Sequence, residues 1–375
     1  MDGSSKSLGV WEYSTGLIAA VIGNVLFVWP GHVVAAAGEN ALGSIAGIIG
    51  AILVSGLLHH KGVLRGRQSL ALRRLLVVSA GIGLGLVGLV DLALVALLTQ
   101  MLHTLFYADT PRWALFLPLV AMVIWAGSVS LDALGRLTQL WVPVGGLVLA
   151  VIAAIGLMHA THVRPLWPQH WYAIPMAHGV GIMAYLLLPV GPVVTCLAPY
   201  VNATVQSIRR GFLLAAATIS LILLAIYGLV TVMLGPDAIP QLRWPLVYSL
   251  ETITLDSTFF ISRIGLAIIF LWTAVVVLAF AVHVRLAVHL IPLSARRSSF
   301  WLSGALGLLY GIGLVAFPTP SASTAWILRV IDPVALGYLV LEHAVVLAMS
   351  AIVSGRDKRP STANGESPRG SPGSG

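Results

Sequence analysis

Charged residues are scarce in this sequence. Asp, Glu, Lys and Arg together make up 9% of the 375 residues, whereas 58% of the residues are apolar. A soluble globular domain usually carries about 25% charged residues. This composition therefore excludes a soluble fold and predicts a protein embedded in membrane lipid.

Cysteine is nearly absent as well, because Cys196 is the single one in the sequence. It excludes an internal disulfide and any thiolate-rich metal site. The histidines are scattered and form no helical pair of ligands, and no acid–base constellation is recognisable. We therefore expect no catalytic residue, no metal site, no cofactor and no enzymatic activity.

Ten stretches are apolar and long enough to cross a bilayer, which takes about 20 residues each. We expect an all-α polytopic membrane protein over residues 1–355, followed by a disordered tail at 356–375 that is rich in Ser, Pro and Gly. The first stretch has no signal-peptide cleavage site, so we expect it to remain. The predicted spans lie at about 14–37, 41–58, 75–102, 112–130, 138–159, 176–198, 211–234, 258–290, 298–317 and 325–353.

Basic residues give the expected orientation, because short loops rich in Lys and Arg remain in the cytoplasm. With both termini inside, sixteen Lys and Arg residues fall in inner regions, and three fall in outer loops: Arg112, Arg164 and Arg243. The sequence thus predicts ten spans with both termini cytoplasmic. The net charge of +8 is explained by this topology, and we expect no nucleic-acid partner.

The first and sixth stretches are interrupted by helix-breaking residues. Gly23, Asn24 and Pro30 lie inside the first, and Pro189, Gly191 and Pro192 lie inside the sixth. Irregular backbone at membrane depth is tolerated only where it is buried in protein or lines a cavity. Paired interruptions in corresponding positions of two halves indicate a transporter-type binding site.

We predict that a small polar ligand, most simply an amino acid, lies between the two interruptions. The ends of broken helices expose unpaired amides and carbonyls, which suit a zwitterion. Glycine at either interruption permits close approach to the backbone. The predicted ligand-binding residues are Gly23, Asn24, Leu188, Val190 and Gly191.

Ionisable residues within apolar spans are expensive and by default indicate function. Glu342 in the tenth stretch is the first candidate, since it should face the bundle interior, and Asp91 in the third is the second. Arg329 and Asp332 are three residues apart, so we expect them to pair on one helix face near the outer surface. The segment from His59 to Arg67 is predicted to form a basic inner loop.

Several short patterns, in this order and spacing, resemble the spore germination permeases. These are the B-type membrane subunits of germinant receptors, within the amino acid–polyamine–organocation transporter superfamily. The patterns are Gly23–Pro30 followed by Ala37–Ala41, Asp109–Trp113, Gly135–Pro143, Ala198–Tyr200, and Gly235–Pro236 with Trp244–Pro245.

The resemblance implies a LeuT-like inverted repeat of five plus five helices, with segments 1–5 at 14–159 and segments 6–10 at 176–353, and with helices one and six broken. It also implies two partners, an A-type subunit with soluble domains and a C-type lipoprotein, assembled in the inner spore membrane. Two positions depart from the family pattern. Gln100 and Pro192 stand where family members often carry glutamate.

Three functions remain open from the sequence. The first is a germinant-receptor subunit that binds a small germinant and signals to its partners. The second is an amino acid transporter of the same superfamily, although Thr273 stands almost alone as a hydroxyl for a sodium site in the eighth stretch. The third, a membrane enzyme or haem protein built on the histidines, is the weakest.

Overall fold

The computed structural model describes residues 8–24, 29–66, 69–158, 160, 173–251, 264–290 and 298–357. These residues are almost wholly helical, and one isolated bridge pairs Leu8 with Val201. The first half contains α1 (Val10–Ile22), α2 (Trp29–Ala37), η1 (Gly38–Asn40), α3 (Ala41–Gly66), α4 (Leu70–Leu105), α5 (Arg112–Ser128) and α6 (Leu131–Met158). The second half contains α7 (Ala173–Ile182), η3 (Ala184–Leu186), α8 (Val190–Leu197), η4 (Ala198–Tyr200), α9 (Val205–Leu234), η5 (Ile239–Gln241), α10 (Pro245–Glu251), α11 (Ile264–Leu290), α12 (Ser298–Ala316), α13 (Pro320–Trp326), η6 (Ile327–Ile331) and α14 (Asp332–Asp357).

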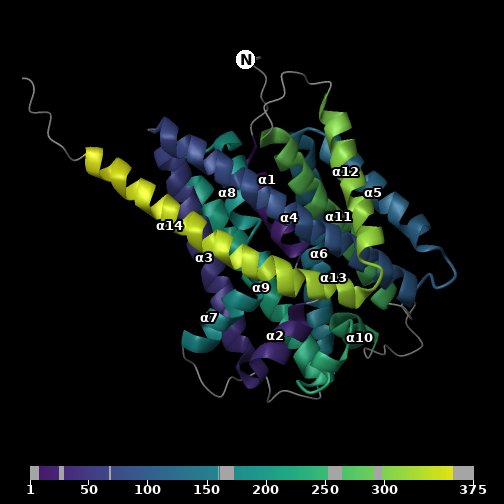
Figure 1. Ribbon diagram of the computed structural model, residues 1–375. Coiled ribbons are helices and arrows are strands. Elements are labelled where there is room, and N and C mark those ends of the chain that lie inside the picture. The colour runs from purple at the N-terminus through teal and green to yellow at the C-terminus, as the bar shows by residue number, and fades with distance from the viewer. Residues whose placement is uncertain are drawn as a thin grey trace, which may run out of the picture.

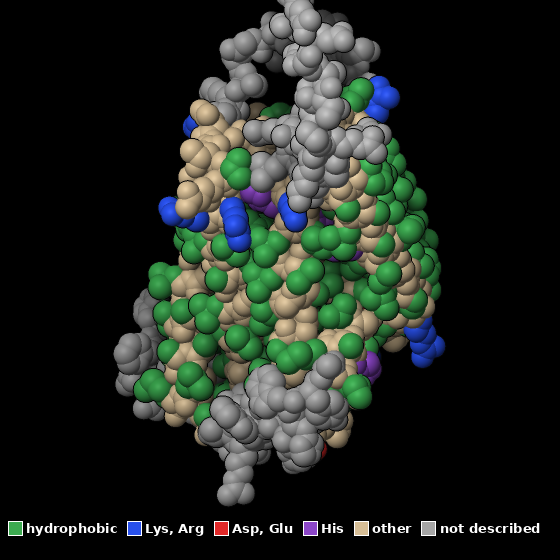
Figure 2. All heavy atoms as spheres, turned by 90° about the vertical axis from the view of Figure 1, so that its left-hand side faces the viewer, with side chains coloured by type: hydrophobic (Ala, Val, Ile, Leu, Met, Phe, Trp, Pro, Cys, Tyr) green, Lys and Arg blue, Asp and Glu red, His purple; other side chains and the backbone are tan. Residues whose placement is uncertain are grey.

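Many of these helices could cross a membrane. Within the described ranges six are long and apolar enough, and the count is seven if the bent pair α7 and α8 forms one span. Three shorter apolar helices, Val10–Ile22, Arg112–Ser128 and Gly307–Ala316, add to these. Hydrophobic side chains cover the middle of the face in Figure 2, and most of the visible Lys and Arg side chains lie toward its upper end. The chain is thus a polytopic membrane protein.

Both expected interruptions fall between separate helices. α1 ends at Ile22 and α2 begins at Trp29, whereas α7 and α8 are bent by 69° around η3. Pro189 is the N-cap of α8, and Pro192 lies in its first turn. Proline is tolerated there, because the first amides of a helix have no intrahelical acceptor. The prolines of the sixth stretch therefore begin the second half-helix, and the irregular backbone lies before them.

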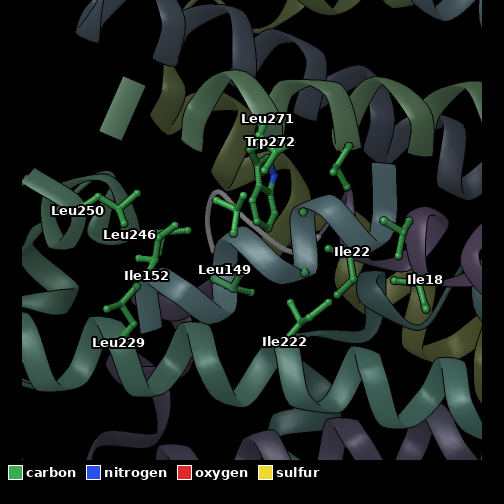
Figure 3. A pocket seen from close by; sticks show the side chains of 15 residues that line it. Ile18, Ile22, Leu149, Ile152, Ile222, Leu229, Leu246, Leu250, Leu271 and Trp272 are labelled. Atoms are coloured by element: carbon green, nitrogen blue, oxygen red, sulfur yellow. The ribbon is translucent and has the colours of Figure 1, made fainter. Parts of the chain in front are cut away.

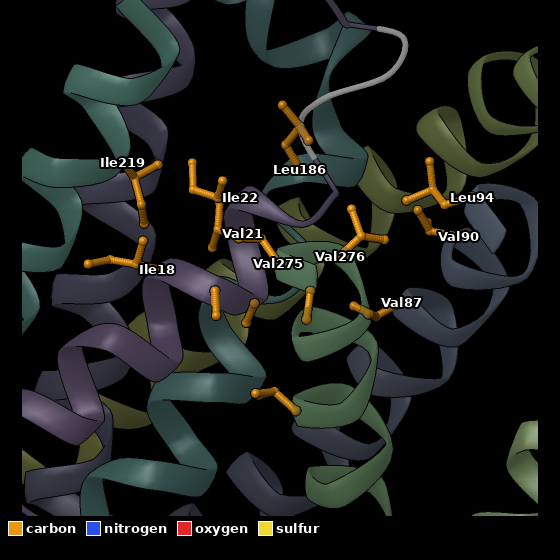
Figure 4. Close-up of a cluster of buried hydrophobic side chains, with 14 of the residues drawn as sticks. Ile18, Val21, Ile22, Val87, Val90, Leu94, Leu186, Ile219, Val275 and Val276 are labelled. Atoms are coloured by element: carbon orange, nitrogen blue, oxygen red, sulfur yellow. The ribbon is translucent and has the colours of Figure 1, made fainter. Parts of the chain in front are cut away.

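The core is built around α1, which packs against α6, α9 and α11. Ile18 and Ile22 of α1 lie on the side of Ile219 from α9, and α11 separates α1 from α4 (Figure 4). α14 runs diagonally across the front of the bundle, and α2, α7 and α10 lie at its lower end (Figure 1). The interrupted first helix is thus enclosed on several sides by continuous helices.

α3 and α7 cross at very short range. A Cβ on Gly47 would overlap the backbone of Met176, and a Cβ on Gly179 would overlap the backbone of Ser44. The Ser44 hydroxyl donates to the carbonyl of Pro175 at 3.0 Å. Small residues with a polar contact are a common way for membrane helices to associate, because lipid supplies no hydrophobic force between them.

Some sequence-based boundaries need correction. The second span does not end near residue 58, because α3 continues to Gly66, and both His59 and His60 are buried. The basic inner loop predicted from His59 to Arg67 is therefore mostly helix. α14 continues to Asp357, and the rest of the predicted tail, residues 358–375, lies outside the described part of the chain.

The glycine crossing predicts a position-dependent effect of valine. Gly47→Val should destabilise the protein by about 1–3 kcal/mol or more, because overpacking forces two backbones apart. Gly50→Val on the same helix is the matched control, since a Cβ there meets nothing within 4 Å. Thermal unfolding of both variants in detergent measures the difference. Equal stability of the two variants would contradict the crossing.

Candidate functional site

The interruption after α1 places a polar side chain in an apolar core. Asn24 is 1% exposed, and both polar atoms of its side chain have no hydrogen-bond partner among the described residues. A buried amide without a partner is destabilising by about 1–3 kcal/mol. Gly23, beside it, packs so close to α11 that a Cβ would overlap that of Ala279. Gly23 therefore serves a helix contact in this conformation, and Asn24 is the polar group that remains available.

The interruption between α7 and α8 is closed by a carboxylate from α14. Asp332 is 3% exposed, and its Oδ1 accepts a hydrogen bond from the backbone N–H of Tyr185 at 2.9 Å. Its Oδ2 is buried without a partner in the described part of the chain. The predicted pair with Arg329 is thus wrong, since Arg329 is exposed and Asp332 points inward. The unpaired amide of an irregular turn is the stronger attraction for a buried carboxylate.

All five predicted ligand-binding residues are buried. Leu188 and Val190 belong to the hydrophobic core. Gly191 faces the ring of His59, and a Cβ there would lie 2.6 Å from the His59 Nε2. α1 and α8 contact each other, so the structure brings the two interrupted segments together. In this conformation, Gly23 lies against Ala279 and Gly191 lies against His59.

A polar cluster joins α3, α4 and α14 beside α8. The Nε2 of His59 lies 3.1 Å from the Oε1 of Glu342, and the two side chains are 1% and 2% exposed. The Ser79 hydroxyl donates to the same carboxylate oxygen at 2.5 Å, and the Tyr338 hydroxyl lies 2.7 Å from it. Glu342 therefore faces the bundle interior. This placement avoids the free-energy cost of an ionised carboxylate that faces hydrocarbon.

A second polar cluster surrounds Asp91. Its Oδ2 lies 2.9 Å from the Nδ1 of His283, and the Tyr310 hydroxyl donates to it at 3.1 Å. Gln100, nine residues further along α4, donates from its amide nitrogen to the carbonyl of Phe317 at 2.5 Å. These contacts tie α4 to α11 and α12, and they give both residues structural partners.

Two cavities lie apart from the predicted residues. Figure 3 shows an apolar one of about 40 Å³ between α1, α6, α9, α10 and α11, lined in part by Ile22, Leu149 and Trp272. Its size and apolar lining do not suit a zwitterion. A larger cavity of about 430 Å³ is lined by residues of α3, α4, α8, η4 and α11, among them Arg73 and His289. In the described part of the chain, no group of three or more His, Cys, Asp or Glu side chains could hold a metal ion.

Sequence reasoning missed the partners of these carboxylates. The basic residues after His59 predict a loop there, and no local pattern distinguishes Ser79. One signal was available, because Tyr338 and Glu342 are four residues apart and hence neighbours on one helix face. The contact between His59 and Glu342 joins residues far apart in sequence, which no local pattern reveals.

These features define a polytopic membrane protein with interrupted helices and buried polar clusters at its centre. The family model described as spore germination protein matches residues 86–293, which is more than half of the chain. The chain belongs to the spore germination permease family and is a germination-related membrane protein. No curated protein matches the sequence.

The contact between Asp332 and Tyr185 predicts different effects for two substitutions. Asp332→Ala should lower stability by about 1–3 kcal/mol, because the Tyr185 N–H loses its acceptor inside the bundle. Asp332→Asn should lose less, since its amide oxygen can accept the same bond. Thermal unfolding and hydrogen exchange of the Tyr185 amide measure the effect.

A surface carboxylate provides the comparison. Asp132 pairs with the exposed Arg136 four residues along α6, and such pairs contribute about 0.3–0.5 kcal/mol. Asp132→Ala should therefore change stability little. If Asp332→Ala behaved in the same way, Asp332 would not stabilise the interruption.

Proposed function

We propose that this chain is the B-type membrane subunit of a spore germinant receptor, which binds a small germinant inside the bundle and signals to partner subunits. The observation that carries the proposal is the buried amide of Asn24 at the interruption after α1, which has no hydrogen-bond partner among the described residues, in a member of the spore germination permease family. A zwitterionic amino acid would supply the missing donor and acceptor. Because the surrounding residues are packed, binding requires a shift of α1 or α8.

A ten-helix LeuT-like inverted repeat is part of this proposal. Its first half would be α1 to α6 and its second α7 to α14. The helix contacts support it, because several occur in pairs that the repeat relates. The repeat relates α1 to α7, α3 to α9, α4 to α11 and α5 to α12. α1 packs on α9 as α7 packs on α3, and α5 packs on α11 as α12 packs on α4. In the same way, α5 packs on α4 as α12 packs on α11.

We place the protein in the inner spore membrane with both termini in the cytoplasm. Two contacts support termini on one side. Leu8, before α1, bonds to the backbone of Tyr200, which lines the larger cavity together with Leu76. Leu76 also packs with Val346 in the second half of α14. The excess of basic residues in the predicted inner regions supports the cytoplasmic assignment.

The partners in this proposal are an A-type subunit with soluble domains and a C-type lipoprotein, besides membrane lipid. An amino acid transporter is the alternative. A sodium-coupled transporter would need several hydroxyl oxygens near the interruption of the first helix. Thr273 is the single hydroxyl residue in the stretch from Ile268 to Val275 of α11. This scarcity favours sensing over sodium-driven uptake.

Replacing Asn24 separates a binding role from a structural one. Asn24→Leu should raise the germinant concentration for half-maximal germination by about tenfold or more, equivalent to about 1.4 kcal/mol of lost binding. Its stability in detergent should be unchanged or higher, because an unpartnered buried amide is replaced by an apolar group of similar size. Spores with equal abundance of each variant are assayed against amino acid concentration.

A matched amide supplies the control. Gln100 donates to Phe317, so Gln100→Leu should lower stability and leave the dose-response curve in place. An unchanged dose response for Asn24→Leu would show that the ligand binds elsewhere. A parallel loss of stability and response would show that Asn24 is structural.

Assembly can be tested independently of the ligand. Deletion of the gene should abolish the response to a germinant, and the affinity-purified chain should bring with it a soluble-domain subunit and a lipoprotein. Uptake of labelled amino acid into proteoliposomes that contain this chain alone is the opposing measurement. Uptake without co-purified subunits would favour the transporter.

A further inference from the structure

The tautomer of His59 is fixed by its surroundings. Its Nδ1 lies 2.8 Å from the backbone carbonyl of Ser55. A carbonyl oxygen can only accept, so Nδ1 carries a hydrogen. In a neutral ring, Nε2 would then present a lone pair, and it lies 3.1 Å from the Oε1 of Glu342. An ionised Glu342 would place a second lone pair opposite it.

This arrangement is stable only with one more proton. A proton on His59 gives an ion pair, whereas a proton on Glu342 is donated to the ring in a hydrogen bond. Either way, the pair is neutral overall, as its nearly complete burial demands. We propose that His59 and Glu342 form a binding site for a single proton, and that its occupancy controls the position of α8.

The link to α8 is a direct contact. Gly191 leaves room for the His59 ring, and a Cβ there would lie 2.6 Å from Nε2. Loss of the proton leaves two facing lone pairs, so the ring and the carboxylate move apart. The ring cannot turn without meeting the first turn of α8. Deprotonation therefore loosens the half-helix that follows the sixth interruption.

The larger cavity lies close to the site. Three of its lining residues, Val63, Leu76 and Thr195, lie about one helical turn, or about 5.4 Å, from His59, Ser79 and Gly191 along their helices. The cavity is also lined by Arg73, His289 and Tyr200 at the ends of their helices. The released proton passes to water there.

Other titratable groups near the pair are few among the described residues. From α14, Tyr338 lies beside the carboxylate and the ring of His343 meets that of His59 edge-on at 5.3 Å. His343 Nδ1 donates to its own helix at Leu339. α4 contributes the Ser79 hydroxyl, and α8 contributes Gly191. His60, the next residue along α3, is buried as well.

Cys196 provides a probe of α8. It is the single cysteine of the chain, it is 4% exposed, and it lines the larger cavity. The labelling rate of Cys196 by a small thiosulfonate is measured on the full chain in lipid nanodiscs across a pH series. Glu342→Gln is the reference, because its amide N–H donates to the neutral ring and imitates the proton-bound pair. Dividing the wild-type rate by the reference rate cancels the pH dependence of the thiol reaction.

The ratio should be near one at acidic pH and should rise with pH by up to about tenfold per pH unit, the limit for one linked proton. Asp91→Asn, which alters the other buried pair, should keep this rise. His59→Gln has no titratable ring, so the rise of the ratio with pH should be absent in this variant. If Glu342→Gln does not fold, His59→Gln serves as the reference for the wild-type rate. A ratio that stays flat, or a rise that persists in His59→Gln, would overturn the proposal. No germinant is needed, so failure here is distinct from failure of the receptor assignment.

Discussion

The structure depends on one constraint, which is that backbone amides inside an apolar bundle need partners. The interruption between α7 and α8 leaves the Tyr185 N–H without a helical acceptor, and Asp332 accepts from it. This bond fixes the start of α14 against the sixth segment. The remainder of α14 crosses the front of the bundle, where it meets α3 and α4 (Figure 1). The last helix is thus tied at its start to the irregular backbone of another segment.

α14 also connects the two polar features that involve the sixth segment. Asp332 contacts the residues before α8, and Glu342 contacts His59, whose ring packs on Gly191 within α8. These two carboxylates are ten residues apart, or about 15 Å along the helix. α14 is thus tied to the sixth segment at two points, directly through Asp332 and indirectly through the ring of His59.

Much of the architecture could be predicted from the sequence, and particular contacts could not. The apolar stretches and both interruptions follow from composition and from the placement of Gly and Pro. The role of Gly23 in packing against Ala279 was not predictable, because a glycine suits a ligand and a helix contact equally well. The basic residues after His59 predict a loop, yet α3 continues through this position. The contact with Glu342 offsets the free-energy cost of burying the His59 ring.

By itself the sequence determined that the protein is embedded in a membrane, that its segments are helical, and that the first and sixth are interrupted. These properties depend on local hydrophobicity and on backbone chemistry within a few residues. Only the tertiary structure decided which partner each buried polar group finds. Asp332 bonds to Tyr185 and not to Arg329, and Glu342 meets His59. The reason is physical: hydrogen bonds and ion pairs act over a few ångströms in space, and helix packing alone sets which distant residues come within that range.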